Sequence, residues 1–261
     1  MALGKRIYNI LRFGLGPRAL EKKRAIKAER RLSIFESDRW KRDEGIAQRN
    51  YSSYNDYVEH QVDKLDRIKH RLHETEVADE TRFRKDFTQC EALKNVRSVL
   101  CLGARLGTEV KALRALGYFA LGIDLNPGKD NPYVLAGDFH QLDFPENCVD
   151  AVYTNSLDHA YDLEKILTEV RRVLKPEGIF IAEMHKGYTE GFTPGNYEAF
   201  HWQFQEDFIK QIIHYGEMPL VEKRDLGYLR RDILTQVIFR KPASGIVSAI
   251  HAKVRREVEH Q

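Results

Sequence analysis

Hydrophobic and polar positions divide this chain into two stretches of different texture. Residues 18–90 are dominated by charged side chains and hold almost no glycine or proline, a pattern typical of helices with solvated faces. After residue 90, short apolar runs alternate with segments of helical spacing. Strands that alternate with helices predict a parallel α/β sheet whose two faces are covered by helices.

The apolar runs predict the individual strands. They cover residues 96–102, 118–123, 133–136, 149–154, 179–184, 219–223 and 233–239. The clearest helix spans 161–174, because its apolar residues fall on a single stripe, and further helices are expected at 106–116 and 204–215. We expect the Lys175-Pro176-Glu177-Gly178 turn to end the 161–174 helix, since proline cannot continue a helix and glycine permits a sharp turn.

The composition is that of an ordinary folded protein. Of 261 residues, 42% are hydrophobic, which suffices for a core, and 31% are charged. The three cysteines are odd in number and lack metal-ligand spacing, so we expect reduced thiols in a cytoplasmic protein. No apolar run reaches the ~18 residues of a membrane span, and no secretory signal is expected.

Positive charge is concentrated at the beginning of the chain. Residues 1–31 hold ten Lys and Arg against two Glu, a balance of +8, which leaves −5 for the remainder. The body of the protein carries no basic signature, so we expect no nucleic-acid partner. Ile7, Ile10, Leu11 and Leu15 form an apolar stripe in the basic arm. This arm is expected either to rest peripherally on an anionic membrane surface or to remain solvated.

A glycine-containing turn follows the first strand of the α/β region. Gly103 and Gly107 bracket it, with Ala104 and Arg105 between them. Glycine lets the backbone approach a ligand closely, and free N–H groups at the start of the next helix attract polar or anionic groups. Asp124 ends the second strand, where a carboxylate can accept hydrogen bonds from both ribose hydroxyls of a nucleotide. The alternatives are a turn without a ligand and an aspartate that caps the turn after it.

Five segments in a fixed order resemble a known family. They are 99–108, 122–124, 137–139, 150–155 and 174–178. The series is similar to class I S-adenosylmethionine-dependent methyltransferases, close to the subgroup that methylates small molecules and sugars. The resemblance implies a Rossmann-like, seven-stranded, mostly parallel sheet with helices on both faces, an antiparallel final strand and an N-terminal helical extension.

The resemblance also implies a cofactor site at the carboxyl ends of the strands. The residues expected to bind S-adenosylmethionine are Gly103, Ala104, Arg105, Gly107, Asp124, Leu125, Asp138, Phe139, Asn155 and Ser156. Among them, Asp124 would bind the ribose hydroxyls. Asp138 would accept a hydrogen bond from the adenine amino group, with Phe139 beside the base. Asn155 and Ser156 would face the methionine portion or the methyl acceptor.

Two positions depart from the family pattern. Cys101 stands where the family usually has an acidic residue, and Arg105 where it usually has a third glycine. Arg105 would pair with the cofactor carboxylate or point to solvent. These departures keep open a non-catalytic cofactor-binding or scaffold protein as an alternative. A nicotinamide-dependent oxidoreductase is disfavoured, because the G-x-G-x-x-G spacing is absent around Gly103.

Candidate catalytic groups follow the fourth and fifth strands. The expected reaction is O-methylation of a small molecule or glycan, which benefits from a general base. His159 is the first candidate for that base, with Asp158 beside it and His185 second, although either histidine could instead serve packing. No compact ligand cluster indicates a metal. The aromatic residues of the segment 187–202 are expected to form a wall for the acceptor or, equally, to pack an insertion.

These features divide the chain into three parts. Residues 1–90 form a basic arm and helical extension, residues 91–242 the methyltransferase domain, and residues 243–261 a polar helical tail. The segment from Tyr51 to Gln61 is expected to close over the cofactor, with Tyr51, Tyr54 and His60 as contacts. A dimerisation helix in a homodimer is the equal alternative.

Overall fold

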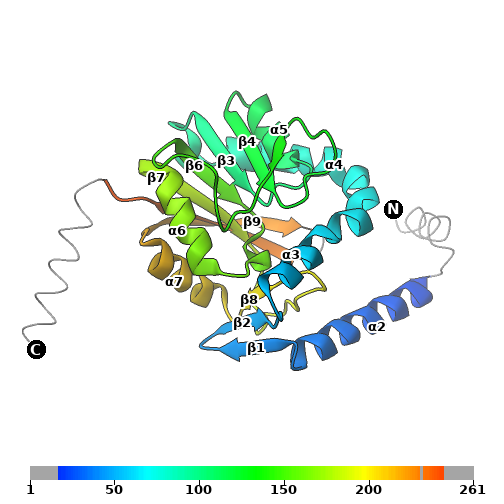
Figure 1. The fold of residues 1–261 in the computed structure, drawn as a ribbon. Coiled ribbons are helices and arrows are strands. Elements are labelled where there is room, and N and C mark those ends of the chain that lie inside the picture. The colour runs from blue at the N-terminus through cyan, green and yellow to red at the C-terminus, as the bar shows by residue number, and fades with distance from the viewer. Residues whose placement is uncertain (1–16, 230–231, 244–261) are drawn as a thin grey trace, which may run out of the picture.

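The computed structural model describes residues 17–229 and 232–243, and its centre is a seven-stranded sheet (Figure 1). The strands are β3 (Ser98–Leu102), β4 (Phe119–Asp124), β5 (Val134–Ala136), β6 (Val149–Thr154), β7 (Leu174–Met184), β9 (Leu220–Leu229) and β10 (Asp232–Arg240). Their order is β5-β4-β3-β6-β7-β10-β9, and β10 alone runs antiparallel to both of its neighbours. The expected fold class is therefore confirmed.

Helices cover both faces of this sheet. α4 (Lys64–Thr88) and α5 (Thr108–Ala115) pack together on one face, and α6 (Leu163–Val173) and α7 (Gln205–Gly216) on the other (Figure 1). The central strand β6 is buried on both sides, since Ala151, Val152 and Tyr153 are each 0% exposed. A core on each face explains why the strands are continuous apolar runs.

The sequence predicts a simple turn at Lys175–Gly178 after the helix, but the structure has a bulge there. Val149 pairs with Leu174 and Ala151 with Ile179, so these four residues bulge within β7. Glu177 adopts a φ of 64° in this bulge. The helix does end at Val173, but the chain enters the sheet immediately, because Leu174 is fully buried.

The N-terminal region contains a small sheet that the sequence analysis missed. After α2 (Pro17–Glu36), strands β1 (Trp40–Asp43) and β2 (Ile46–Arg49) form a hairpin, and β8 (Phe200–Trp202) pairs with β2. The hairpin is short and mostly charged, so no apolar run reveals it. The pairing joins the N-terminal region to a segment about 150 positions further along the sequence.

The helical stretch that follows is broken into two helices. α3 (Tyr54–Val62) and α4 meet at Asp63, and Ser53 caps α3 by accepting a hydrogen bond from the Asp56 N–H. Two short 3-10 turns complete the described elements, η1 (Glu91–Leu93) and η2 (Leu157–His159).

Some expectations fall on residues outside the described ranges. The apolar stripe of the basic arm lies in residues 1–16, and nearly all of the expected C-terminal tail lies in residues 244–261. Among residues 17–229 and 232–243, no helix is both long and apolar enough to cross a membrane.

Candidate active site

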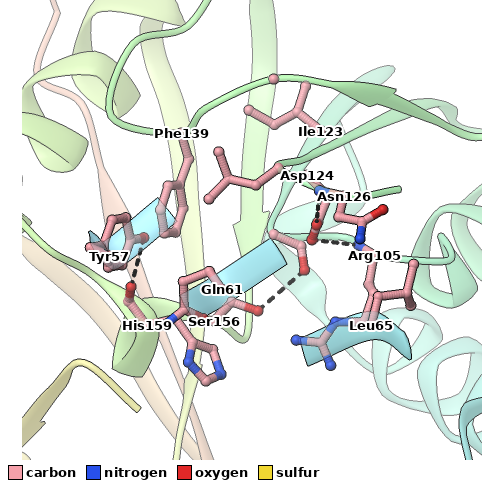
Figure 2. A pocket seen from close by; sticks show the side chains of 13 residues that line it. Tyr57, Gln61, Leu65, Arg105, Ile123, Asp124, Asn126, Phe139, Ser156 and His159 are labelled. Carbon is pink, nitrogen blue, oxygen red and sulfur yellow. Dashed lines mark hydrogen bonds between the residues drawn. The ribbon is translucent and has the colours of Figure 1, made fainter. Parts of the chain in front are cut away.

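The strand order reverses between β3 and β6, and this edge of the sheet holds a pocket (Figure 2). Ligands of open α/β sheets bind outside the carboxyl ends of the strands at such a switch point. We call this the strand-edge pocket. Its lining residues are Tyr57, Gln61, Leu65, Gly103, Arg105, Ile123, Asp124, Leu125, Asn126, Gly137, Phe139, Ser156 and His159.

The turn after β3 is shaped by close contact with Ser156 and Asp124. Gly103 has a φ of 66°, and a Cβ there would lie 2.7 Å from the Cβ of Ser156, so only glycine fits without displacement. Arg105 also has a positive φ, of 48°. Its backbone N–H donates to Oδ2 of Asp124 at 2.9 Å, which stabilises this uncommon conformation.

Asp124 caps the turn that follows it and also lines the pocket. Its Oδ1 accepts a hydrogen bond from the Asn126 N–H at 2.8 Å, so it does cap the following turn. It also lines the pocket, and an ionised carboxylate has about four acceptor positions, of which these bonds use two. Burial raises the pKa of Asp124, while the Arg105 charge opposes that shift. Acceptor capacity for ligand hydroxyls remains.

Asp138 is engaged differently from the expectation. Its Oδ1 accepts from the backbone N–H of His140 at 2.9 Å and contacts His140 Nδ1 at 2.8 Å, and its Oδ2 accepts from the Tyr54 hydroxyl. Burial opposes its ionisation, but these hydrogen bonds lower its pKa overall. Asp138 does not line the strand-edge pocket, whereas its neighbours Gly137 and Phe139 do.

Gly107 also lies outside the pocket lining. It caps α5 with a φ of 79°, and a Cβ there would come within 2.8 Å of Val134. Its glycine is therefore explained by packing against β5. Of the other expected cofactor residues, Leu125 lines the strand-edge pocket, and Ala104 and Asn155 line a second cavity beside it.

This second cavity, which we call the charged cavity, has a volume of about 550 Å³. It shares Gly103, Arg105, Ser156 and His159 with the strand-edge pocket, so the two spaces meet at one wall. Seven basic residues line it, from helices α2 and α4 and the turn after β3: Lys27, Arg31, Lys64, Arg67, Arg71, Arg82 and Arg105. The structure brings all three predicted catalytic residues, Asp158, His159 and His185, to this cavity.

The hydrogen bonds of His159 define its protonation. Its Nδ1 lies 2.8 Å from the carbonyl oxygen of Tyr197, which can only accept, so Nδ1 carries the proton. Its Nε2 therefore accepts, and Lys64 Nζ lies 2.5 Å from it. Burial and the Lys64 charge hold the pKa of His159 well below its ordinary value. His159 is a neutral acceptor already occupied by Lys64, which does not favour it as the base.

Asp158 differs from His159 in its hydrogen bonding and in the direction of its pKa shift. It is 9% exposed, and its Oδ1 has no hydrogen-bond partner among the described residues. Burial, with a smaller contribution from Glu198, raises the pKa of this carboxyl to about 6. A carboxyl group beside a cavity, with a pKa just below neutrality, is ionised at neutral pH and can take a proton from a ligand.

The residues at the end of β7 serve packing and charge balance. The His185 ring stacks on Phe192 with centroids 4.6 Å apart, and its carbonyl accepts from Trp202 Nε1. Glu183 is fully buried on its side chain, and its Oε2 lies 3.0 Å from Nη1 of Arg82.

The expected aromatic wall is mostly absent. Trp202 stacks on Phe208, with ring centroids 4.1 Å apart, and Tyr188 packs on Phe35. Of the aromatic residues between 187 and 202, Tyr197 is the one that lines the charged cavity. The others pack within the protein, which is the alternative that the sequence left open, and β8 carries Phe200 and Trp202 into the core.

The predicted covering segment lies over the pocket, but through other residues than expected. Tyr57, Gln61 and Leu65 line the pocket at helical spacing, and Figure 2 shows Tyr57 close to Phe139. Tyr54 bonds to Asp138, and Tyr51 bonds to His60 at 2.8 Å. Lys64 is not among the residues predicted from the sequence, because a lysine beside an apolar helix stripe ordinarily keeps its charge in water.

The described residues suit a nucleoside-containing cofactor and a polar second ligand. The strand-edge pocket offers carboxylate acceptors beside apolar and aromatic surfaces, and the charged cavity offers cations and one unpartnered carboxylate oxygen. Among residues 17–229 and 232–243, no three His, Cys, Asp or Glu side chains are placed to hold a metal ion.

Comparison with known sequences identifies part of this region. Residues 100–182 match the family model described as a methyltransferase domain. A sterol 24-C-methyltransferase of Gibberella zeae is 53% identical over 45 residues, which are 17% of this chain and 12% of that protein. A sterol 24-C-methyltransferase of Yarrowia lipolytica is 48% identical over 52 residues, 20% of this chain and 14% of that protein. The matched part therefore spans only about an eighth of the length of these relatives.

Solved structures share the fold over a larger part of the chain. The 1,6-didemethyltoxoflavin-N1-methyltransferase of Burkholderia thailandensis, solved with its substrate and S-adenosylhomocysteine, superposes with a TM-score of 0.60 at 15% identity. The alignment covers 77% of this chain and 97% of that one. A putative methyltransferase in complex with the Trm112 activator of Haloferax volcanii gives a TM-score of 0.53 at 18% identity, covering 70% and 97% of the two chains.

Proposed function

We propose that this chain, which resembles class I methyltransferases in the sequence of residues 100–182 and in its seven-stranded sheet, is an S-adenosylmethionine-dependent methyltransferase. One observation carries the proposal. The strand-edge pocket contains Asp124 at the end of β4 and adjoins, at Gly103 and Ser156, a second cavity that can hold an acceptor. A transferase needs two such sites in contact, because the nucleophile must approach the transferred group in line.

The residues of the strand-edge pocket fit the parts of this cofactor. Asp124 has acceptor positions for the ribose hydroxyls, and Phe139 and Ile123 offer apolar surface to the base. Gly103 and Ser156 lie where the pocket meets the charged cavity, so the methionine portion would extend past them. When bound, S-adenosylmethionine supplies a methyl group on a positively charged sulfur, which a nucleophile can displace.

In this proposal Asp158 takes the proton of the acceptor. Its side chain lines the cavity, and its buried Oδ1 makes no hydrogen bond to the described residues, so a hydroxyl or amine placed against it could donate to it. Its raised pKa still leaves it mostly ionised at neutral pH. His159 positions Lys64 by accepting a hydrogen bond from its amine, and Tyr197 fixes the ring.

The charged lining favours a polar acceptor, either a small molecule or a glycan. A sterol-sized apolar ligand would bury against seven basic residues and leave their charges poorly solvated. The matches to sterol methyltransferases cover only 17% and 20% of this chain, so they carry no argument for a sterol acceptor.

Calorimetry with S-adenosylhomocysteine tests the function. We expect micromolar binding, and Asp124→Asn should weaken it at least tenfold, because a hydrogen bond to a charged group contributes about 1.5–3 kcal/mol. Asp143→Asn, at an exposed position outside both spaces, is the matched control and should bind normally. Binding of NAD in place of S-adenosylhomocysteine would contradict the proposal.

A further inference from the structure

We propose that the charged cavity binds an acceptor carrying a compact anionic group, a carboxylate or a phosphate, and that Lys64 and Arg105 form the clamp for it. This inference rests on the proposed function and names its class of substrate. Its basis is the set of contacts that these two side chains make in the cavity, and the counter-ions that they lack there.

Arg105 supplies the first cation. Its side chain lines both spaces at the wall where they meet. Within the described residues, its contacts are made by its backbone N–H and carbonyl, and its guanidinium has no hydrogen bond or ion pair. A guanidinium presents several donors in a planar fork that matches carboxylate and phosphate oxygens. The backbone of Arg105 has a positive φ, and the hydrogen bond from its N–H to Asp124 holds the turn after β3 in this conformation.

Lys64 supplies the second cation. It is only 8% exposed, and its amine contacts the neutral Nε2 of His159 and lies 5.6 Å from the Tyr197 ring centroid. No carboxylate of the described residues lies within 4.0 Å of it. Burial and the nearby Arg105 charge lower its pKa. An anion between the two cations would remove their mutual repulsion and supply the missing counter-charge.

The remaining charges of the cavity also favour an anion. Arg67 and Arg71 follow Lys64 on α4 at helical spacing, and Lys27 and Arg31 line the cavity from α2. Arg67 pairs with Asp63, and Arg31 lies 3.9 Å from Glu198, so these two charges are partly neutralised. Several of the acids contribute little negative charge. Glu183 is paired with Arg82, and burial raises the pKa of Glu109 to about 8, so it is mostly neutral at pH 7.

Asp158 indicates the second feature of the ligand. Asp158 lines the same cavity, and its Oδ1, which makes no hydrogen bond to the described residues, requires a donor, which a fully ionised anion lacks. The acceptor would therefore carry a hydroxyl or amine for Asp158 and, elsewhere in the molecule, the anionic group for Lys64 and Arg105.

Calorimetry on the full chain saturated with S-adenosylhomocysteine tests this clamp. Three probes are titrated: inorganic phosphate, glucuronate, and glucose as the uncharged counterpart of glucuronate. We expect phosphate or glucuronate to bind and glucose not to bind. Lys64→Met and Arg105→Met should each weaken anion binding at least tenfold. Lys69→Met and Arg84→Met, on exposed positions of α4, are the matched controls and should bind as the unaltered chain does.

The outcomes separate the clamp from the proposed function. Binding of phosphate alone or glucuronate alone supports the clamp and identifies which anion it prefers. Equal binding of glucose, or no anion binding, overturns the clamp while S-adenosylhomocysteine binding still stands. Anion binding that disappears when S-adenosylhomocysteine is present would assign these cations to the cofactor carboxylate and also overturn it. Failure of S-adenosylhomocysteine to bind would overturn the proposed function itself, and with it the acceptor assignment. Thermal unfolding of each variant verifies that it is folded.

Discussion

Neighbouring residues of η2 acquire opposite chemistry from the groups around them. Asp158 and His159 are adjacent in sequence and both line the charged cavity. Burial and the Lys64 charge keep His159 neutral, whereas Asp158 has a raised pKa and a carboxylate oxygen that makes no hydrogen bond to the described residues. The sequence placed both near the reaction and ranked the histidine first. Burial and hydrogen bonding, which a sequence does not display, favour the aspartate.

Asp158→Asn should stabilise the protein above pH 6 while it abolishes most of the activity. A carboxyl whose folded pKa is about 6, against 3.8 unfolded, retains its full contribution to stability below pH 3.8 and loses it as pH rises through 6. Asparagine cannot ionise, so the variant should gain about 1–3 kcal/mol at pH 7.5 and nearly nothing at pH 4. Thermal unfolding at the two pH values measures the difference.

The same variant should transfer methyl groups at least 100-fold more slowly, since a general base contributes about 10²–10⁴-fold. A labelled-methyl assay with the acceptor found by screening provides this readout, and Asp143→Asn is the control. An unchanged rate would remove Asp158 from the mechanism, and equal stability of the two proteins at pH 7.5 would show that its carboxylate is not destabilised by burial.

At the scale of an element, α4 joins the core to the charged cavity. Its C-terminal half packs Phe83 and Phe87 against Tyr153 of β6, and its N-terminal half lines the cavity with basic residues. Arg82 lies between the halves, with its guanidinium carbon 3.9 Å from the Phe83 ring centroid. Its Nη1 lies 3.0 Å from carboxylate oxygens of both Asp86 and Glu183. The sequence predicts this helix but not its partner on β7, 101 positions away.

Arg82→Met should destabilise the fold by about 3–5 kcal/mol, because it leaves the buried Glu183 without its counter-charge. Urea unfolding measures the free energy. Arg84→Met, which removes only an exposed pair with Glu80, should change it by less than about 1 kcal/mol. The double variant Arg82→Met/Glu183→Gln should recover much of the loss; no recovery would mean that Arg82 acts through packing on Phe83 and not through the ion pair.

At the scale of the whole molecule, the N-terminal helices and the sheet form one ligand site. Tyr57, Gln61 and Leu65 line the strand-edge pocket from α3 and α4, together with residues of β4, of η2 and of the turn after β3. The Tyr57 hydroxyl donates to the His159 carbonyl at 2.9 Å, and Gln61 Nε2 donates to the Tyr197 carbonyl at 2.8 Å. These bonds hold the helices over the pocket, so a bound cofactor would contact both sides.

A ligand between these parts should stabilise the molecule as a unit. S-adenosylhomocysteine at about 100 times its Kd contributes about 2.7 kcal/mol, equivalent to a Tm increase of about 5–10 °C in a chain of this size. Hydrogen exchange should slow in residues 54–68 as well as at the strand ends. Asp124→Asn should show neither effect at the same ligand concentration. A Tm increase without protection of 54–68 would show that α3 and α4 do not cover the cofactor.

Local pattern determined the sheet, the positions of its strand ends and the glycine turn, because buried parallel strands are apolar runs and their carboxyl ends meet at one edge. It also placed Asp124, Phe139 and Ser156 at that edge. Only the tertiary structure brought Lys64 to His159, left Oδ1 of Asp158 without a hydrogen bond to the described residues, and paired β2 with β8. These arrangements depend on burial and on contacts between residues about 40 to 150 positions apart, which no local pattern records. Asp138 is a further example, because its carboxylate accepts a hydrogen bond from Tyr54, 84 positions earlier in the sequence, and does not line the pocket.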